Sequence, residues 1–185
     1  MERCEECEFD YEALDPGAVQ SALRSLGGRF AMRVSNERGD ATLDTTIRTR
    51  PSPKVWSALE YSCHVRDVFL IQRERVYQAL VEECPSFARM YRDERVTLAR
   101  YAAETPNDVG RELKIAADML AWAFAGLDDA QWARRCTYNY PDRTERTVLW
   151  LGRHAVHEGE HHLRDVDAAL RSAAATSDHR SQPAL

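Results

Sequence analysis

Three segments of this chain open with the same pair of residues, a capping residue followed directly by proline. The pairs are Asp15-Pro16, Ser52-Pro53 and Thr105-Pro106. The first residue of each pair suits the non-helical N-cap position, and proline suits the first helical position because the N–H that it lacks would be unpaired there. We therefore expect a helix after each pair, and apolar periodicity predicts a fourth near the C-terminus. The expected ranges are 16–35, 53–83, 106–126 and 143–173.

Four long helices predict an all-α fold, a four-helix bundle, and 185 residues are enough to give one domain a real core. Residues 39–50 are polar and β-branched, which predicts an ordered loop across the bundle. A link of this length favours a bundle with a long crossover connection over a simple up-and-down order. Residues 86–104 predict one further helix with a loop, and residues 132–141 predict a short helix end followed by an extended aromatic loop.

These patterns divide the chain into three parts. They are an N-terminal cysteine-containing segment over residues 1–13, the bundle over residues 14–173, and a disordered tail over residues 174–185. The N-terminal segment shows no apolar core of a signal peptide, so we expect a cytoplasmic protein with reduced thiols. The five cysteines are an odd number without a framework spacing, which argues against a disulfide scaffold.

The composition is that of a soluble globular protein, with 44% hydrophobic and 30% charged residues. No apolar run approaches the roughly 20 residues that a membrane span needs, so we expect no membrane partner. The net charge of −5 and the pI near 5.7 give no basic surface overall. We therefore expect no nucleic-acid partner.

Imidazoles and carboxylates are concentrated in residues 157–165, which read HEGEHHLRD. Two ligand-capable side chains four residues apart lie on one face of a helix, so such a pair can share a metal ion with a third ligand from another helix. Two pairs have this spacing, His157 with His161 and Glu158 with His162. The sequence therefore contains two competing registers for a metal-binding pair.

A helical wheel with about 100° per residue favours the second pair. The apolar residues of this helix form one stripe that must face the core. They are Val148, Leu151, Ala155, Gly159, Val166 and Leu170. On the same wheel His162 falls within the stripe and Glu158 at its edge, whereas His157 points almost opposite and His161 lies to the side. Glu158 and His162 are thus the predicted inward pair, and a different helix phase would favour the two histidines.

His64 lies beside the buried stripe of the second predicted helix, which suits a ligand at a cleft in the bundle. The alternative is a buried histidine that is hydrogen-bonded to a neighbouring carboxylate. Together with the C-terminal cluster, the pattern favours His64, Glu158 and His162 as metal ligands. Asp165 follows His162 by three residues on the same side, where it can accept the other N–H of the ring or orient a water. Pairing of Asp165 with a surface arginine is the alternative.

Cys4 and Cys7 form a C-x-x-C pair, which is half of a zinc knuckle or a redox dithiol. A second Cys/His pair at matching spacing is absent from the sequence. We therefore interpret Cys4 and Cys7 as a mobile pair of reduced thiols near a chain end. Pairing with Cys136, or across a homodimer, would complete a site.

Two separate motifs of the sequence carry a family resemblance. Residues 56–67, WSALEYSCHVRD, and the later motif Glu158-x-x-x-His162-x-x-Asp165 resemble the DinB-like metalloprotein superfamily over nearly the whole bundle. The resemblance implies a four-helix bundle whose metal is held by one histidine of the second helix and by a His/Glu-x-x-x-His pair of the last helix. These positions are His64, Glu158 and His162 here. The glutamate at the first place of the pair resembles mycothiol-dependent maleylpyruvate isomerase, and other members are bacillithiol or mycothiol S-transferases.

Three protein ligands leave an open coordination position, which is typical of a catalytic divalent metal. A thiol that enters this position loses its proton. The resemblance therefore implies a metal-dependent S-transferase or thiol-assisted isomerase, in which a low-molecular-weight thiol such as mycothiol attacks a small electrophilic metabolite. The alternatives are a metal-dependent hydrolase and a non-catalytic metal- or ligand-binding stress protein. The N/O donor set favours zinc, with nickel, iron or manganese as alternatives. Candidate substrate contacts are Arg143, Arg146, Trp150, Tyr138, Tyr140 and Trp56.

Overall fold

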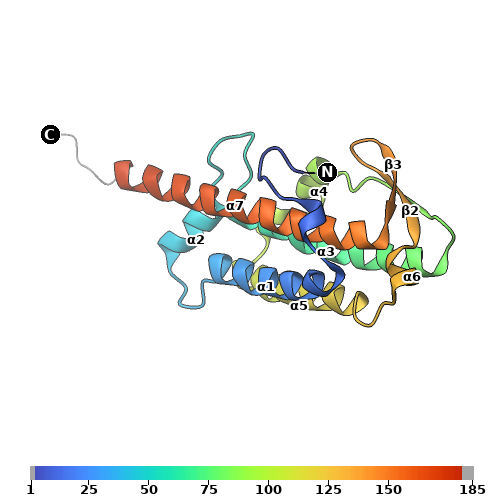
Figure 1. The fold of residues 1–185 in the computed structure, drawn as a ribbon. Coiled ribbons are helices and arrows are strands. Elements are labelled where there is room, and N and C mark those ends of the chain that lie inside the picture. The colour runs from blue at the N-terminus through green and yellow to red at the C-terminus, as the bar shows by residue number, and fades with distance from the viewer. Residues whose placement is uncertain (1–2, 181–185) are drawn as a thin grey trace.

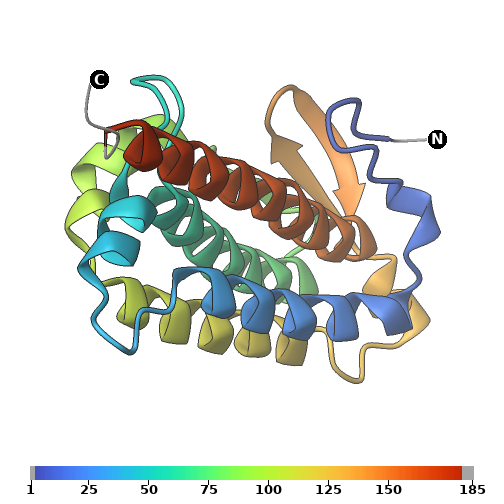
Figure 2. The same ribbon diagram turned by 90° about the vertical axis from the view of Figure 1, so that its left-hand side faces the viewer.

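The computed structural model describes residues 3–180, with side chains through residue 176, and four long helices make up most of it (Figures 1 and 2). They are α1 (Pro16–Val34), α3 (Ala58–Val81), α5 (Pro106–Ala123) and α7 (Val148–Arg180). The predicted bundle is confirmed. The last helix continues to Arg180, past the expected end at residue 173. The remainder of the expected tail, residues 181–185, lies outside the described residues.

The first two long helices of the chain, α1 and α3, contact each other only slightly. Helix α1 packs mainly against α5 and α7, and α3 packs against the same two helices. Residues 35–57 join α1 to α3 and include the short helix α2 (Ala41–Arg48), which contacts α3 and α7. We expected a loop here. The segment forms a helix because the Asp40 carboxylate accepts hydrogen bonds from the backbone N–H groups of Thr42 and Leu43.

Helix α3, which carries His64, begins at Ala58 and not at Pro53 as predicted. The start is fixed by a capping box, in which the Ser57 hydroxyl accepts from the Glu60 N–H and the Glu60 carboxylate accepts from the Ser57 N–H. Arg50 donates two further hydrogen bonds to this carboxylate, over 2.6 and 2.7 Å. This reciprocal cap outweighs the helix-start preference of a single proline. Helices α1 and α5 do begin at their predicted prolines.

The prediction of a purely helical fold is wrong in one region, where a small sheet is present. Strand β2 (Arg135–Asn139) pairs in parallel with β1 (Ser86–Phe87) and antiparallel with β3 (Arg143–Thr147). We expected residues 143–147 to begin the last helix. They pair with β2 instead, whose alternate residues Cys136 and Tyr138 are buried in the core. The Thr147 hydroxyl then accepts the N–H of Trp150 and caps α7.

Short elements cover the ends of the bundle. Residues 86–104 form no single long helix but begin with β1 and continue into α4 (Arg92–Leu98) and the 3-10 helix η2 (Tyr101–Ala103). A second 3-10 helix, η1 (Tyr11–Ala13), precedes α1, and α6 (Asp129–Trp132) precedes the hairpin of β2 and β3. The N-terminal segment with η1 runs beside α7 (Figure 1).

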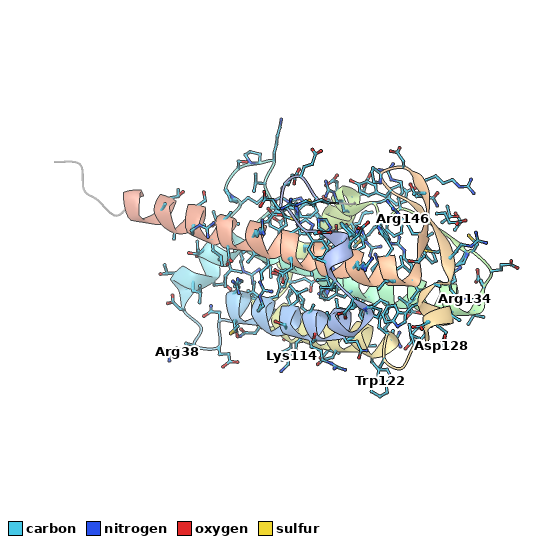
Figure 3. All side chains as sticks on the ribbon, in the orientation of Figure 1. Arg38, Lys114, Trp122, Asp128, Arg134 and Arg146 are labelled. Carbon is cyan, nitrogen blue, oxygen red and sulfur yellow. The ribbon has the colours of Figure 1, made fainter. Side chains whose placement is uncertain are left out.

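The core lies between the four long helices, and their outer faces carry both polar and apolar residues. Figure 3 shows Lys114 and Trp122 pointing away from the bundle on α5, where the Trp122 side chain is 70% exposed. At the end of α3, Arg134 donates to the carbonyl oxygens of Ala79 and Glu82 and so satisfies backbone groups that a helix end leaves unpaired. Among the described residues no helix combines the length and apolarity that a membrane crossing requires.

Candidate metal centre

Two neighbouring helices bring His64, Glu158 and His162 together inside the bundle. His64 belongs to the second turn of α3 and is 2% exposed, and the other two residues belong to the inner face of α7, which packs against α3. Close to this point α7 approaches α1 through Gly159, where an added Cβ atom would lie 2.5 Å from Leu26 Cδ1. The predicted inward pair, Glu158 and His162, is the pair that lies beside His64 of α3.

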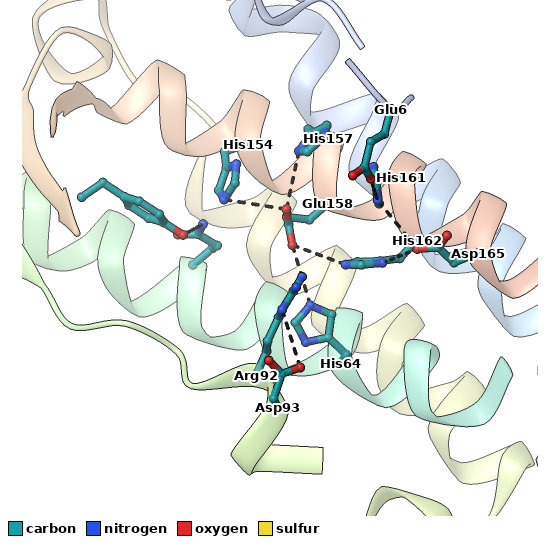
Figure 4. Close-up of polar contacts among 12 residues, drawn as sticks. Glu6, His64, Arg92, Asp93, His154, His157, Glu158, His161, His162 and Asp165 are labelled. Atoms are coloured by element: carbon teal, nitrogen blue, oxygen red, sulfur yellow. Dashed lines mark hydrogen bonds and ion pairs between the residues drawn. The ribbon is translucent and has the colours of Figure 1, made fainter. Parts of the chain in front are cut away.

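The ligand atoms of these three residues converge on one point (Figure 4). One atom from each residue lies within 4.8 Å of the others. Glu158 Oε2 is 3.7 Å from His64 Nε2 and 3.7 Å from His162 Nε2. These distances are too long for hydrogen bonds. Two ligands at about 2.1 Å from a tetrahedral ion stand about 3.4 Å apart, so the observed spacing fits a shared ion.

Neither ring nitrogen of His64 has a hydrogen-bond partner among the residues that the structure describes. A buried imidazole without a partner is costly, and ordinary buried histidines are hydrogen-bonded. The nearest carboxylate oxygen, Glu158 Oε2, lies 3.7 Å from His64 Nε2, beyond hydrogen-bond distance. Two imidazoles and one carboxylate are a donor set that suits zinc and related divalent ions, and three ligands leave a coordination position open. The residues present thus fit a divalent metal.

Asp165 orients His162. The His162 Nδ1–H donates to Asp165 Oδ2 over 2.8 Å, which turns Nε2 of the same ring toward Glu158. Although burial disfavours a charged ring, Asp165 and Glu158 raise the pKa of His162 to about 9. Burial also opposes ionisation of Glu158, but the histidines around it hold its pKa well below the ordinary value. At neutral pH the Glu158 carboxylate thus faces a protonated His162, and a metal that bound here would displace the proton from Nε2 of that ring.

The other pair of the C-terminal cluster does not reach His64. His157 and His161 belong to the side of α7 that faces the N-terminal segment, and Figure 4 shows the His157 ring directed at Glu158, not at His64. His161 Nε2 lies 3.4 Å from Glu6 of the N-terminal segment. The two pairs therefore occupy adjacent faces of one helix, with Glu158 between them.

A cavity of about 240 Å³ opens beside the three converging side chains. Its wall includes His64 and Glu158, and its outer part is lined by residues of α4 and of the segment before it. Of the candidate substrate contacts, Tyr138 and Tyr140 line this cavity, and Trp56 lines a second hollow that reaches His162. Within the described part of the chain, Arg143, Arg146 and Trp150 line neither of the two.

Two residues that line the cavity, His154 and Arg75, were not among the predicted site residues. His154 Nδ1 is hydrogen-bonded to the Tyr11 hydroxyl over 3.0 Å, and its Nε2 lies 4.0 Å from Glu158 Oε1. Burial lowers the pKa of His154 to about 4. Arg75 donates to the Tyr138 hydroxyl over 2.9 Å. The i, i+4 spacing of His154 and Glu158 was the available signal for the first residue, whereas nothing local marks Arg75.

The protein is thus a helical bundle with a candidate divalent-metal site beside a cavity. The family model of the DinB superfamily matches residues 31–166 of the 185, and the chain belongs to that superfamily. The structure is similar to YfiT from Bacillus subtilis, with a TM-score of 0.72, 16% sequence identity, and coverage of 92% of this chain and 90% of that chain. YfiT is described as a probable metal-dependent hydrolase with an unusual four-helix bundle topology. No curated protein matches the sequence.

Proposed function

We propose that His64, Glu158 and His162 hold a divalent metal, zinc by preference, and that the protein is a metal-dependent enzyme that activates a nucleophile beside the cavity. The observation that carries this proposal is the convergence of the three ligand atoms within 4.8 Å at the cavity wall. The unpaired ring nitrogens of His64 support it, because a metal would satisfy one of them. Nickel, iron and manganese accept the same donors.

The nucleophile that we favour is a low-molecular-weight thiol of the mycothiol type, attacking a small electrophilic metabolite by S-transfer or thiol-assisted isomerisation. When bound, a divalent metal of this kind acidifies a thiol or water that ligates it and so supplies a nucleophile at neutral pH. The cavity, at about 240 Å³, suits a small metabolite or the reactive end of a larger thiol. The thiol preference rests on the resemblance of the Glu158-x-x-x-His162-x-x-Asp165 motif to thiol-dependent members of the superfamily.

The chain's own residues would bind and orient the reactants. Arg75, Arg89 and Arg92 line the cavity and present positive charge to an anionic or polyhydroxylated thiol. Asp165 holds the His162 ring in place through its 2.8 Å hydrogen bond. His154, kept neutral by burial, places a ring nitrogen near Glu158 where it can exchange a proton with a reactant.

Hydrolysis is the second candidate function. It is favoured by the fold similarity to YfiT, which is described as a probable metal-dependent hydrolase. The same three ligands would serve both reactions, and water would take the place of the thiol. The two functions differ in the nucleophile, so product analysis separates them.

The test is turnover by the purified full-length chain with zinc, nickel, iron or manganese. Thioether formation from mycothiol, bacillithiol or glutathione and chlorodinitrobenzene is compared with hydrolysis of a panel of esters and amides. We expect metal-dependent thioether formation that is lost in His64→Ala and Glu158→Ala. The matched control is Glu160→Gln, which removes a carboxylate of α7 that pairs with Arg29 of α1. This variant should remain active. Hydrolysis without thiol consumption would support the second candidate, and the absence of both reactions with every metal would refute an enzymatic role.

A further inference from the structure

The N-terminal C-x-x-C segment is not a mobile pair of thiols, because it packs against the outer side of α7. Cys7 is 3% exposed, and Cys4 is partly buried. The turn between the cysteines is closed by the hydrogen bond from Glu8 N to Cys4 O over 2.8 Å, and a second bond from Cys4 N to Phe9 O measures 3.0 Å. The interpretation based on sequence alone is therefore wrong, since it ignored what the segment packs against.

The residues opposite the two cysteines are His157 and His161, the pair that does not face His64. One ligand atom from each of Cys4, Cys7, His157 and His161 lies within 4.8 Å of the other three. Cys4 Sγ is 3.9 Å from His161 Nδ1. Around a tetrahedral zinc ion, sulfur and nitrogen ligands stand about 3.6 Å apart, so these side chains need only small movements to share one ion.

We propose that Cys4, Cys7, His157 and His161 form a second metal site, a closed Cys2His2 zinc site that fastens the N-terminal segment to α7. Four protein ligands that include two thiolates define a structural zinc site, whereas the three N/O ligands around His64 leave a position open. The cysteines have the spacing of a zinc knuckle, and the histidines are four residues apart on one helix face. Cys136 is the partner that the sequence suggested, and it takes no part, since it is buried in β2.

The surroundings favour a metal over a plain contact. Neither ring nitrogen of His157 has a hydrogen-bond partner within the part of the chain that the structure describes. Glu158 Oε1 lies 3.5 Å from His157 Nδ1, where a carboxylate can orient a ligating imidazole.

The two sites lie on adjacent faces of α7, and Glu158 faces both. One oxygen of its carboxylate is directed at His64 and His162, and the other is directed at His157. A zinc ion on the outer side would fix the His157 ring and, through it, one oxygen of Glu158. The expected role of the second ion is therefore structural support of the N-terminal segment, with Tyr11 of this segment holding His154 at the cavity.

The experiment is metal analysis of the full-length chain loaded with zinc or with cobalt(II). We expect two ions per chain in the wild type, and one in the double variant Cys4→Ser/Cys7→Ser. The thiolate-to-cobalt charge-transfer band should be present in the wild type and in His64→Ala, and absent in the double variant. Cys84→Ser, which removes a thiol beside Thr137 and Glu145, is the matched control and should keep both ions and the band.

A second measurement applies to the wild-type protein and does not depend on the folding of a variant. Alkylation followed by mass spectrometry should show Cys4 and Cys7 protected when zinc is bound and labelled after chelation. A wild type that binds one ion without a thiolate band, or cysteines that are labelled equally with and without zinc, would overturn the proposal. A disulfide between Cys4 and Cys7 that persists in the presence of a reductant would also overturn the proposal. These outcomes are independent of the inner site, which the His64→Ala variant reports.

Discussion

His162 and Asp165 are joined by a hydrogen bond of 2.8 Å between Nδ1 and Oδ2, one turn apart on the same helix. This bond fixes the ring so that its other nitrogen faces Glu158, at 3.7 Å from Oε2. An acceptor behind a metal-binding imidazole sets both its orientation and its tautomer. Asp165 therefore acts on the candidate metal site through the orientation of the His162 ring.

Loss of this acceptor is expected to weaken metal binding. Asp165→Asn should lower the affinity for zinc by about 10- to 100-fold, as removal of such outer partners typically does. Competition with a zinc chelator measures this change. Asp167→Asn is the control, because it removes a carboxylate of the same helix that pairs with Arg33. Equal affinities of Asp165→Asn and wild type would show that Asp165 does not orient the ligand.

His154 is expected to matter for turnover and not for metal content. Its ring is hydrogen-bonded to Tyr11 and borders the cavity, but it lies 4.0 Å from Glu158 and outside the cluster with His64. His154→Phe should retain the metal and lose about 100-fold or more in turnover, the size of a general acid or base contribution. Metal analysis and initial rates check both parts. Loss of the inner ion in this variant would instead make His154 a ligand.

Stability should depend on pH through Glu60, at the start of α3. Burial disfavours its charged form, but the two hydrogen bonds from Arg50 and the Ser57 backbone hold its pKa below the ordinary value of 4.5. A depressed pKa in the folded state stabilises the protein above the unfolded-state pKa, and this contribution is lost as the pH falls through the folded-state pKa. Glutamine at this position keeps the cap but not the charge.

Glu60→Gln should therefore cost about 1.5–3 kcal/mol at pH 7, the range for hydrogen bonds to charged groups. The difference from wild type should shrink below pH 4.5, as measured by urea unfolding across this range. Glu74→Gln, at an exposed position of the same helix, should cost little at any pH. A Glu60→Gln deficit that is independent of pH would contradict the role of its charge.

Close packing of α1 on α5 should make one glycine irreplaceable. An added Cβ atom at Gly27 would lie 2.9 Å from Ala117 Cβ and 3.1 Å from the Lys114 Cα atom, which belongs to the backbone of α5. Gly27→Ala should thus destabilise the protein by about 1–3 kcal/mol. At the adjacent Gly28, nothing among the described residues lies within 4 Å of an added Cβ atom.

Gly28→Ala is the matched control and should be neutral or stabilise by up to about 1 kcal/mol, because alanine is the better helix former. Thermal unfolding of both variants decides the matter. If Gly27→Ala and Gly28→Ala change the stability equally, the close approach of α1 and α5 does not require glycine at position 27.

The local part of this structure was predictable from local patterns. Pro16 and Pro106 mark the true starts of α1 and α5, and the 3.6-residue periodicity of α7 predicts which side of the helix faces the core. The same periodicity brought Glu158 and His162 to the side where His64 lies. These features depend on residues within a few turns of one another, so the sequence contains them directly. The start of α3 differed because Ser57 and Glu60 supplied a stronger cap than Pro53.

Contacts between distant segments were decided by the tertiary structure alone. Residues 143–147 were expected to begin the last helix, but they form a strand because β2 offers a partner. Cys4 and His161 are 157 positions apart and meet only because the N-terminal segment docks on α7. His154 acquires its setting from Tyr11 in the same way. The identity of a helix face is encoded in its period, whereas what lies against that face depends on how the whole chain packs.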